Sequence, residues 1–75
     1  MFDRGDYVKV VFKDEATRES EWMWVRVERS DDANRVLFGR LDNEPAVMTD
    51  LHIGMELAVS YDNVREHMKS NSFQG

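Results

Sequence analysis

The stretch that decides the fold reads Glu21-Trp22-Met23-Trp24-Val25-Arg26-Val27-Glu28-Arg29. It is rich in aromatic and β-branched residues, which are common in strands. Met23, Val25 and Val27 alternate with bulky or charged side chains. Because successive side chains of a strand point to opposite faces, this period of two predicts a β-strand whose inward face is apolar.

The same alternation predicts further strands on both sides of this stretch. Val8, Val10 and Phe12 alternate with other residues before it, and Leu57 and Val59 are expected to point inward near the end of the chain. Polar turn residues separate the expected strands, because Asp, Asn, Gly and Pro favour tight turns. The ranges expected to be strands are 7–13, 21–29, 35–41, 46–48 and 56–61.

The period changes after Tyr61. Asn63 can cap a helix with Glu66 as its reciprocal partner, and Val64, His67 and Met68 would then share one face. The sequence therefore predicts a mainly β fold with one short C-terminal helix or 3₁₀ turn. The architecture is expected to be a small five-stranded antiparallel, partly open SH3-like barrel, or a strongly bent sheet packed on that helix. Residues 1–69 should form one domain and 70–75 a frayed polar tail.

Length and charge restrict the classes of function. The chain has 75 residues, enough for one hydrophobic core, and no cysteine that could form a disulfide. Its N-terminus shows no signal peptide and no apolar run approaches a membrane span, so a cytoplasmic location is expected. Fifteen acidic residues against ten basic ones give a net charge of -5, which disfavours direct binding to nucleic acid.

Three pieces of the chain occur together in one known family. They are Trp24-Val25-Arg26-Val27, Gly39-Arg40-Leu41-Asp42-Asn43-Glu44-Pro45 and Leu51-His52-Ile53-Gly54-Met55-Glu56-Leu57. In this order they resemble the W-V-x-V strand, G-x-L-x-N-x-P turn and L-x-x-G-x-x-V hairpin of the bacterial family called domain of unknown function 2314, over about residues 6–67. The resemblance implies a stand-alone accessory or immunity-type protein rather than an enzyme, and it implies no substrate and no catalytic residue.

Catalytic and metal-binding chemistry are not expected. With no Cys, two His, and Ser residues confined to turns and the tail, a nucleophile beside a base is hard to assemble. Asp50, His52 and His67 show no ligand spacing typical of a metal site. We therefore expect no enzymatic activity, no metal and no cofactor.

The two tryptophans give the most informative candidate site. Trp22 and Trp24 share the strand face opposite the apolar inward one, so either the strand is buried on both sides or this face is a contact surface. In the second case Tyr61 would join them beside an acidic connection. Its members are Asp14, Glu15, Glu19 and Glu21. Such a surface suits a basic peptide or a basic patch on a protein, which predicts a protein-binding module.

Two alternatives use other features of the chain. An inhibitor or immunity-type protein could occlude the basic site of a nuclease or another nucleic-acid-binding enzyme through acidic turns. The candidate contacts are Asp31, Asp32, Asp42 and Glu44. A homodimer could instead form by pairing exposed edge strands at 7–13 or 46–48. The sequence leaves the identity of the partner open, and also whether the protein is a monomer or a weak homodimer.

Overall fold

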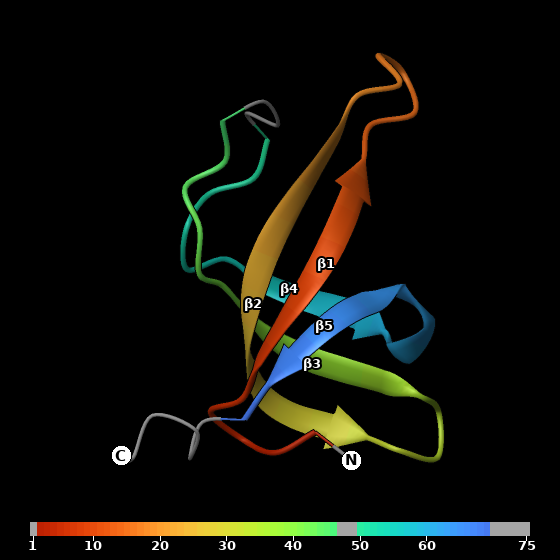
Figure 1. Ribbon diagram of the computed structural model, residues 1–75, viewed down its shortest axis with the longest axis vertical. Coiled ribbons are helices and arrows are strands. Elements are labelled where there is room, and N and C mark those ends of the chain that lie inside the picture. The colour runs from red at the N-terminus through yellow and green to blue at the C-terminus, as the bar shows by residue number, and fades with distance from the viewer. Residues whose placement is uncertain (1, 47–49, 70–75) are drawn as a thin grey trace.

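The computed structural model describes residues 2–46 and 50–69, which form one antiparallel sheet (Figure 1). Its strands are β1 (Tyr7–Lys13), β2 (Ser20–Asp31), β3 (Val36–Leu41), β4 (Glu56–Ser60) and β5 (Val64–Met68). The spatial order is β4-β3-β2-β1-β5, and a 3₁₀ helix, η1 (Tyr61–Asn63), connects β4 to β5. The mainly β fold with five antiparallel strands is confirmed, and the sheet is not closed.

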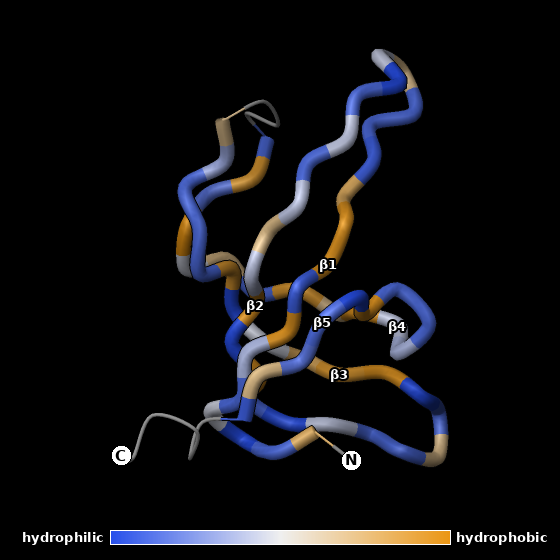
Figure 2. Tube along the Cα trace, viewed as in Figure 1, coloured by the Kyte–Doolittle hydropathy of each residue, from blue (hydrophilic) through white to orange (hydrophobic). Residues whose placement is uncertain are grey.

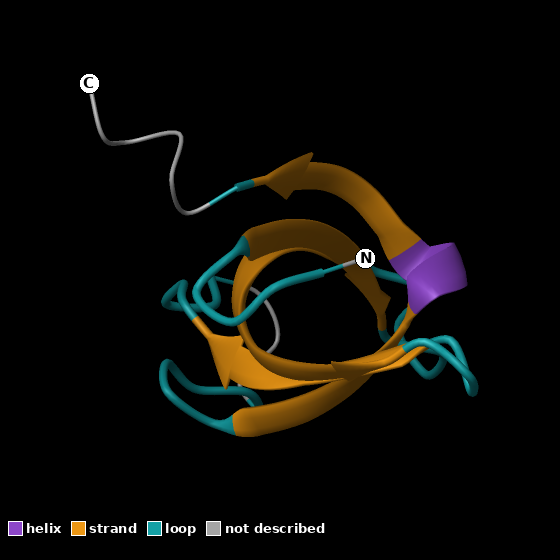
Figure 3. Ribbon diagram, turned by 90° about the horizontal axis from the view of Figure 1, so that it is seen from below, coloured by secondary structure: helices purple, strands orange, loops and turns teal. Residues whose placement is uncertain are grey.

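The sheet curls because β2 serves two neighbours. Its first part, from Ser20 to Arg26, pairs with β1, and its last part, from Val25 to Asp31, pairs with β3. The register shifts between Val27 and Arg29, a bulge of the kind that increases strand twist and bending. Figure 3 shows the resulting curl of the sheet around its interior.

Gly39 allows β3 to lie close against this bend. A Cβ atom at Gly39 would stand 2.2 Å from the backbone oxygen of Arg26 and 2.8 Å from Cγ1 of Val25. Contacts that short do not occur in folded proteins, so no larger residue fits without movement of β2 or β3.

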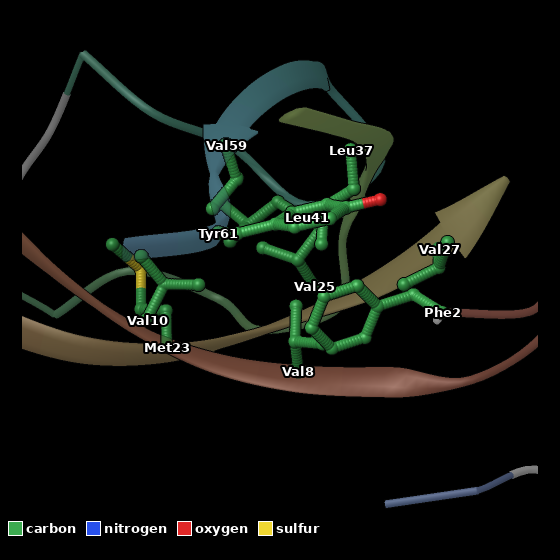
Figure 4. Close-up of a cluster of buried hydrophobic side chains, with 10 residues drawn as sticks. All are labelled: Phe2, Val8, Val10, Met23, Val25, Val27, Leu37, Leu41, Val59 and Tyr61. Carbon is green, nitrogen blue, oxygen red and sulfur yellow. The ribbon is translucent and has the colours of Figure 1, made fainter. Parts of the chain in front are cut away.

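The hydrophobic core fills the concave side of the sheet (Figure 4). Most inward positions predicted from the alternation are buried, since Val8, Val10, Met23, Val25 and Val27 are at most 3% exposed and Val59 is 4% exposed. Phe12 and Leu57, also predicted to point inward, are partly buried against this core. The full buried set is Phe2, Val8, Val10, Met23, Val25, Val27, Leu37, Leu41, Val59 and Tyr61. Figure 2 shows the same contrast along the chain, with hydrophobic segments in the strands and hydrophilic ones in the connection between β1 and β2.

Two of the predicted elements differ from the structure or fall largely outside the described residues. Ala46 lies in a bend outside the strands, and the rest of the strand expected at 46–48 falls outside the described residues. The helix expected after Tyr61 is only the single turn of η1, and residues 64–68 form β5. Ser60, not Asn63, caps the turn, because its hydroxyl accepts a hydrogen bond from the Asp62 backbone N–H.

The strand β5 pairs with β1, so β1 is not an edge strand of the sheet. Val64 pairs with Val10 and Met68 with Tyr7. The exposed edge expected over 7–13 is therefore wrong for its first four residues, and the outer strands are β4 and β5.

The N-terminal segment and the end of β5 are held together by polar side-chain contacts. The Asp6 carboxylate is 1% exposed, and its Oδ2 lies 2.7 Å from His67 Nε2 and 3.5 Å from Lys69 Nζ. Lys69 also lies 2.8 Å from Asp3 Oδ2, which raises the pKa of the lysine. The two ends of the described chain are thus neighbours. Within the described residues no helix has the length and apolar character needed to cross a membrane.

Candidate functional site

The two tryptophans of β2 lie on the convex, outward face of the sheet. Met23, the residue between them, is 1% exposed, whereas Trp22 is 53% exposed and Trp24 is half-buried. Of the two readings of this face, burial on both sides is therefore wrong at Trp22. Trp22 and Ile53 are the exposed large hydrophobic side chains of the described residues. Because the core is filled without Trp22, this side chain is free to contact another molecule.

Lys9 of β1 lies between the two indoles. Its Nζ is 5.7 Å from the centroid of the Trp22 ring and 5.9 Å from that of Trp24, within range of cation–π attraction. The same amine lies 3.3 Å from the carboxylate of Glu66 on β5, so its charge is compensated. Sequence reasoning missed Lys9, although the register that pairs it with Trp24 would have placed it there.

In the acidic connection between β1 and β2, some carboxylates accept hydrogen bonds from the backbone and others are exposed. Asp14 Oδ1 accepts hydrogen bonds from the backbone N–H groups of Ala16 and Thr17, which shapes the turn. Glu21 accepts one from the Ala46 N–H at 2.7 Å. Glu15 and Glu19 are exposed and remain available for a partner. Asp14 and Glu21 thus make contacts within the protein, and the contact role suggested for all four acids stays a prediction.

The backbone of Trp24 is fixed by the connection between β3 and β4. The Trp24 N–H donates to Oδ1 of Asn43, and the Trp24 carbonyl accepts from the Asp42 N–H at 2.9 Å. Together with the bond from Ala46 to Glu21, these contacts hold residues 42–46 along the edge of β2 that β3 leaves free. The exposed indole of Trp22 therefore stands on a strand supported on both edges.

Tyr61 does not belong to this surface. Its ring is 7% exposed, lies in the core in an edge-to-face contact with Phe2, and its hydroxyl donates to Asp32 Oδ1 at 2.5 Å. Burial and the hydrogen bond to Asp32 raise the pKa of Tyr61, and the same hydrogen bond lowers the pKa of Asp32. The expectation that Tyr61 would join the two tryptophans is wrong, because Tyr61 continues the inward alternation of Val59.

The four acidic residues suggested for an inhibitor do not form one surface. Asp31 and Asp32 lie at the turn before β3, whereas Asp42 and Glu44 follow its last residue. Figure 1 shows these two connections at opposite ends of β3. Asp31 is engaged by the Asn34 side chain, which lowers the pKa of Asp31.

The histidines show no arrangement for metal binding. His67 is bonded to the buried carboxylate of Asp6, and Asp50 and His52 are exposed on the connection between β3 and β4. Over residues 2–46 and 50–69, no group of three or more His, Cys, Asp or Glu side chains is placed to hold a metal ion.

A family model connects this architecture to known sequences. The model described as "Uncharacterized protein conserved in bacteria (DUF2314)" matches residues 3–74. The chain belongs to this family. The match confirms the resemblance seen in the sequence and extends it beyond residues 6–67 at both ends. No curated protein and no solved structure matches the chain.

Three residues of the DUF2314 resemblance have clear structural roles in this chain. Gly39 permits the close approach of β3 to β2, Asn43 binds the backbone of Trp24, and Gly54 has a φ of 88° in the turn that leads into β4. A positive φ of this size strains residues that carry a Cβ. These residues therefore maintain the fold around the tryptophan surface.

Proposed function

We propose that this protein is a small protein-binding module whose contact surface is the outward face of β1 and β2 around Trp22. The observation that carries the proposal is the 53% exposure of Trp22 on a strand whose opposite face is fully buried. Exposed tryptophans on rigid elements are enriched among residues that dominate binding energy at interfaces. Binding, without catalysis, is the activity that such a surface performs.

The charge around Trp22 supports a partner with a basic patch. Residues 13–21 carry four acidic and two basic side chains, and the chain as a whole carries -5. Glu15 and Glu19 are exposed in this connection. Because Glu66 compensates Lys9, the cation beside the indoles does not cancel that negative field. Such a field accelerates association with a basic partner and weakens with salt.

We also propose that the sheet is an SH3-like barrel and that the protein is cytoplasmic. Support for an SH3-like barrel comes from the strand order, the bent β2 shared by both halves of the sheet, and η1 between β4 and β5. We place the module in the cytoplasm, where a chain without cysteine has no disulfide to lose.

The proposal is tested by capture from a lysate of the bacterial host with the purified protein as bait. Trp22→Ala should lose a partner that the unchanged protein retains. Ile53→Ala is the matched control, because Ile53 is the other exposed large hydrophobic residue of the part that the structure describes and is 54% exposed. Both variants should keep their unfolding midpoint, since neither side chain is part of the buried core.

The outcomes separate this function from its alternatives. A partner lost with Trp22→Ala, kept with Ile53→Ala and weakened by Glu19→Lys or by high salt supports the proposal. Identical captures by both variants would contradict it. The inhibitor role stays a prediction with no single acidic surface behind it, and the homodimer is tested by sedimentation of the pure protein.

A further inference from the structure

The end of β1 and the strand β4 each have an edge without a strand partner among the described residues, and the two edges line one groove. On the side away from β2, β1 pairs with β5 only from Tyr7 to Val10, so Val11–Lys13 has no strand partner there among the described residues. Among the described strands, β4 pairs with β3 alone. A groove of about 390 Å³ lies between the end of β1 and residues Ala58 and Val59 of β4.

We propose that this groove binds an extended acidic peptide segment of a partner protein, which adds as a strand between β1 and β4. Unpaired strand edges present N–H and C=O groups that bind extended chains, a recurrent mode of peptide recognition. Here two such edges face the same groove. A strand placed between them would satisfy both and close the sheet.

The charge of the groove selects an acidic segment. Its charged lining residues are Lys13 and Arg65, with no carboxylate among the lining side chains. No described side chain pairs with Lys13, and both cations are exposed. In a chain of net charge -5, all the charged side chains that line this groove are cations. Acidic side chains would be attracted to it and basic ones repelled.

The apolar lining and the size define the rest of the segment. Phe12 is partly buried against the core and Val59 is 4% exposed, so the floor of the groove is apolar. The three residues of β1 that have no described strand partner on the groove side span about 10 Å at about 3.4 Å per residue. A segment of about five residues with alternating acidic and β-branched side chains would direct one set to this floor and the other towards the two cations.

The test is a titration of the ¹⁵N-labelled full chain with acetyl-Glu-Val-Glu-Val-Glu-amide. We expect saturable shifts of the backbone amides of Val11–Lys13, Ala58 and Val59. The same peptide with Lys in place of Glu should bind more weakly, and N-methylation of both Val residues should abolish binding by removing backbone donors. Absence of shifts at these amides up to the solubility limit of the peptide would overturn the proposal.

Charge variants test the role of the two cations. Lys13→Glu with Arg65→Glu should raise the Kd about fivefold to tenfold, as expected for the loss of two exposed ion pairs. Lys13→Glu alone is compared with Arg4→Glu, which makes the same change of charge in the N-terminal turn and should leave the Kd unchanged, and so should Trp22→Ala. Equal weakening by Arg4→Glu would show that only net charge matters. Shifts of the same amides on concentrating the protein alone would assign the groove to a second copy and would also refute the proposal.

Discussion

Asn43 should be worth a measurable share of the stability through a single hydrogen bond. Its Oδ1 accepts the N–H of Trp24, and the Asn43 side chain is only half-exposed. Asn43→Ala removes the acceptor and leaves this donor without a protein partner. A partly buried unsatisfied donor costs about 1–2 kcal/mol, because water restores some of the bond. A 75-residue domain has a total of about 4–11 kcal/mol, so the loss is large.

Asn43→Asp is the matched variant for this prediction, because a carboxylate oxygen can accept the same hydrogen bond. In urea unfolding at pH 7, Asn43→Ala should lower the free energy of unfolding by about 1–2 kcal/mol with an unchanged m-value, and Asn43→Asp by less than half as much. The Trp24 amide should also exchange with solvent faster in Asn43→Ala alone. Equal stability of the Ala and Asp variants would refute the assigned hydrogen bond.

Other predictions concern the glycines and the response to pH. Gly39→Ala should destabilise by about 1–3 kcal/mol, because its Cβ meets Arg26 O at 2.2 Å, and Gly54→Ala by about 1–2 kcal/mol, from its positive φ alone. Thermal unfolding should rank Gly39→Ala as the less stable; the reverse order would contradict the steric reason. The lowered pKa of Asp32 adds stability that is present above about pH 4 and lost as pH falls below it. In urea unfolding, the free energy of unfolding of Asp32→Asn should therefore fall less steeply with decreasing pH than that of the unchanged protein. An equally steep fall would count against this reasoning. The raised pKa of Tyr61 adds stability that is lost as pH rises above about 10, and Tyr61→Phe should remove that loss in the same assay.

The sequence was most informative where side chains alternate over many residues. In β2, Met23, Val25 and Val27 could be assigned to the core because a period of two over nine residues fits no helix. The five residues 64–68 gave no such distinction, since so short a segment fits both periods. Pairing with β1, which is distant in sequence, decided in favour of the strand.

The candidate site was predictable only in part, for a related reason. The outward face of Trp22 and Trp24 follows from the alternation, and the same rule applied from Val59 would have placed Tyr61 inward. The position of Lys9 between the indoles depends on the register between two strands, which the sequence of either strand does not contain. The bonds that engage Asp14 and Glu21 depend on loop geometry, so their structural duties could not be separated from surface charge.

The contact of residues 3–6 with residues 67–69 has a consequence for the connectivity of the molecule. Asp6 bonds His67 and Asp3 bonds Lys69, so a short linker from Lys69 to Phe2 would not have to cross the sheet. A new opening could then be cut in the exposed connection between β1 and β2, far from that junction (Figure 1). Such a circular permutant would retain every strand pairing and lose only the covalent connection between β1 and β2. The order of the elements along the chain is therefore separable from the arrangement that forms the surface.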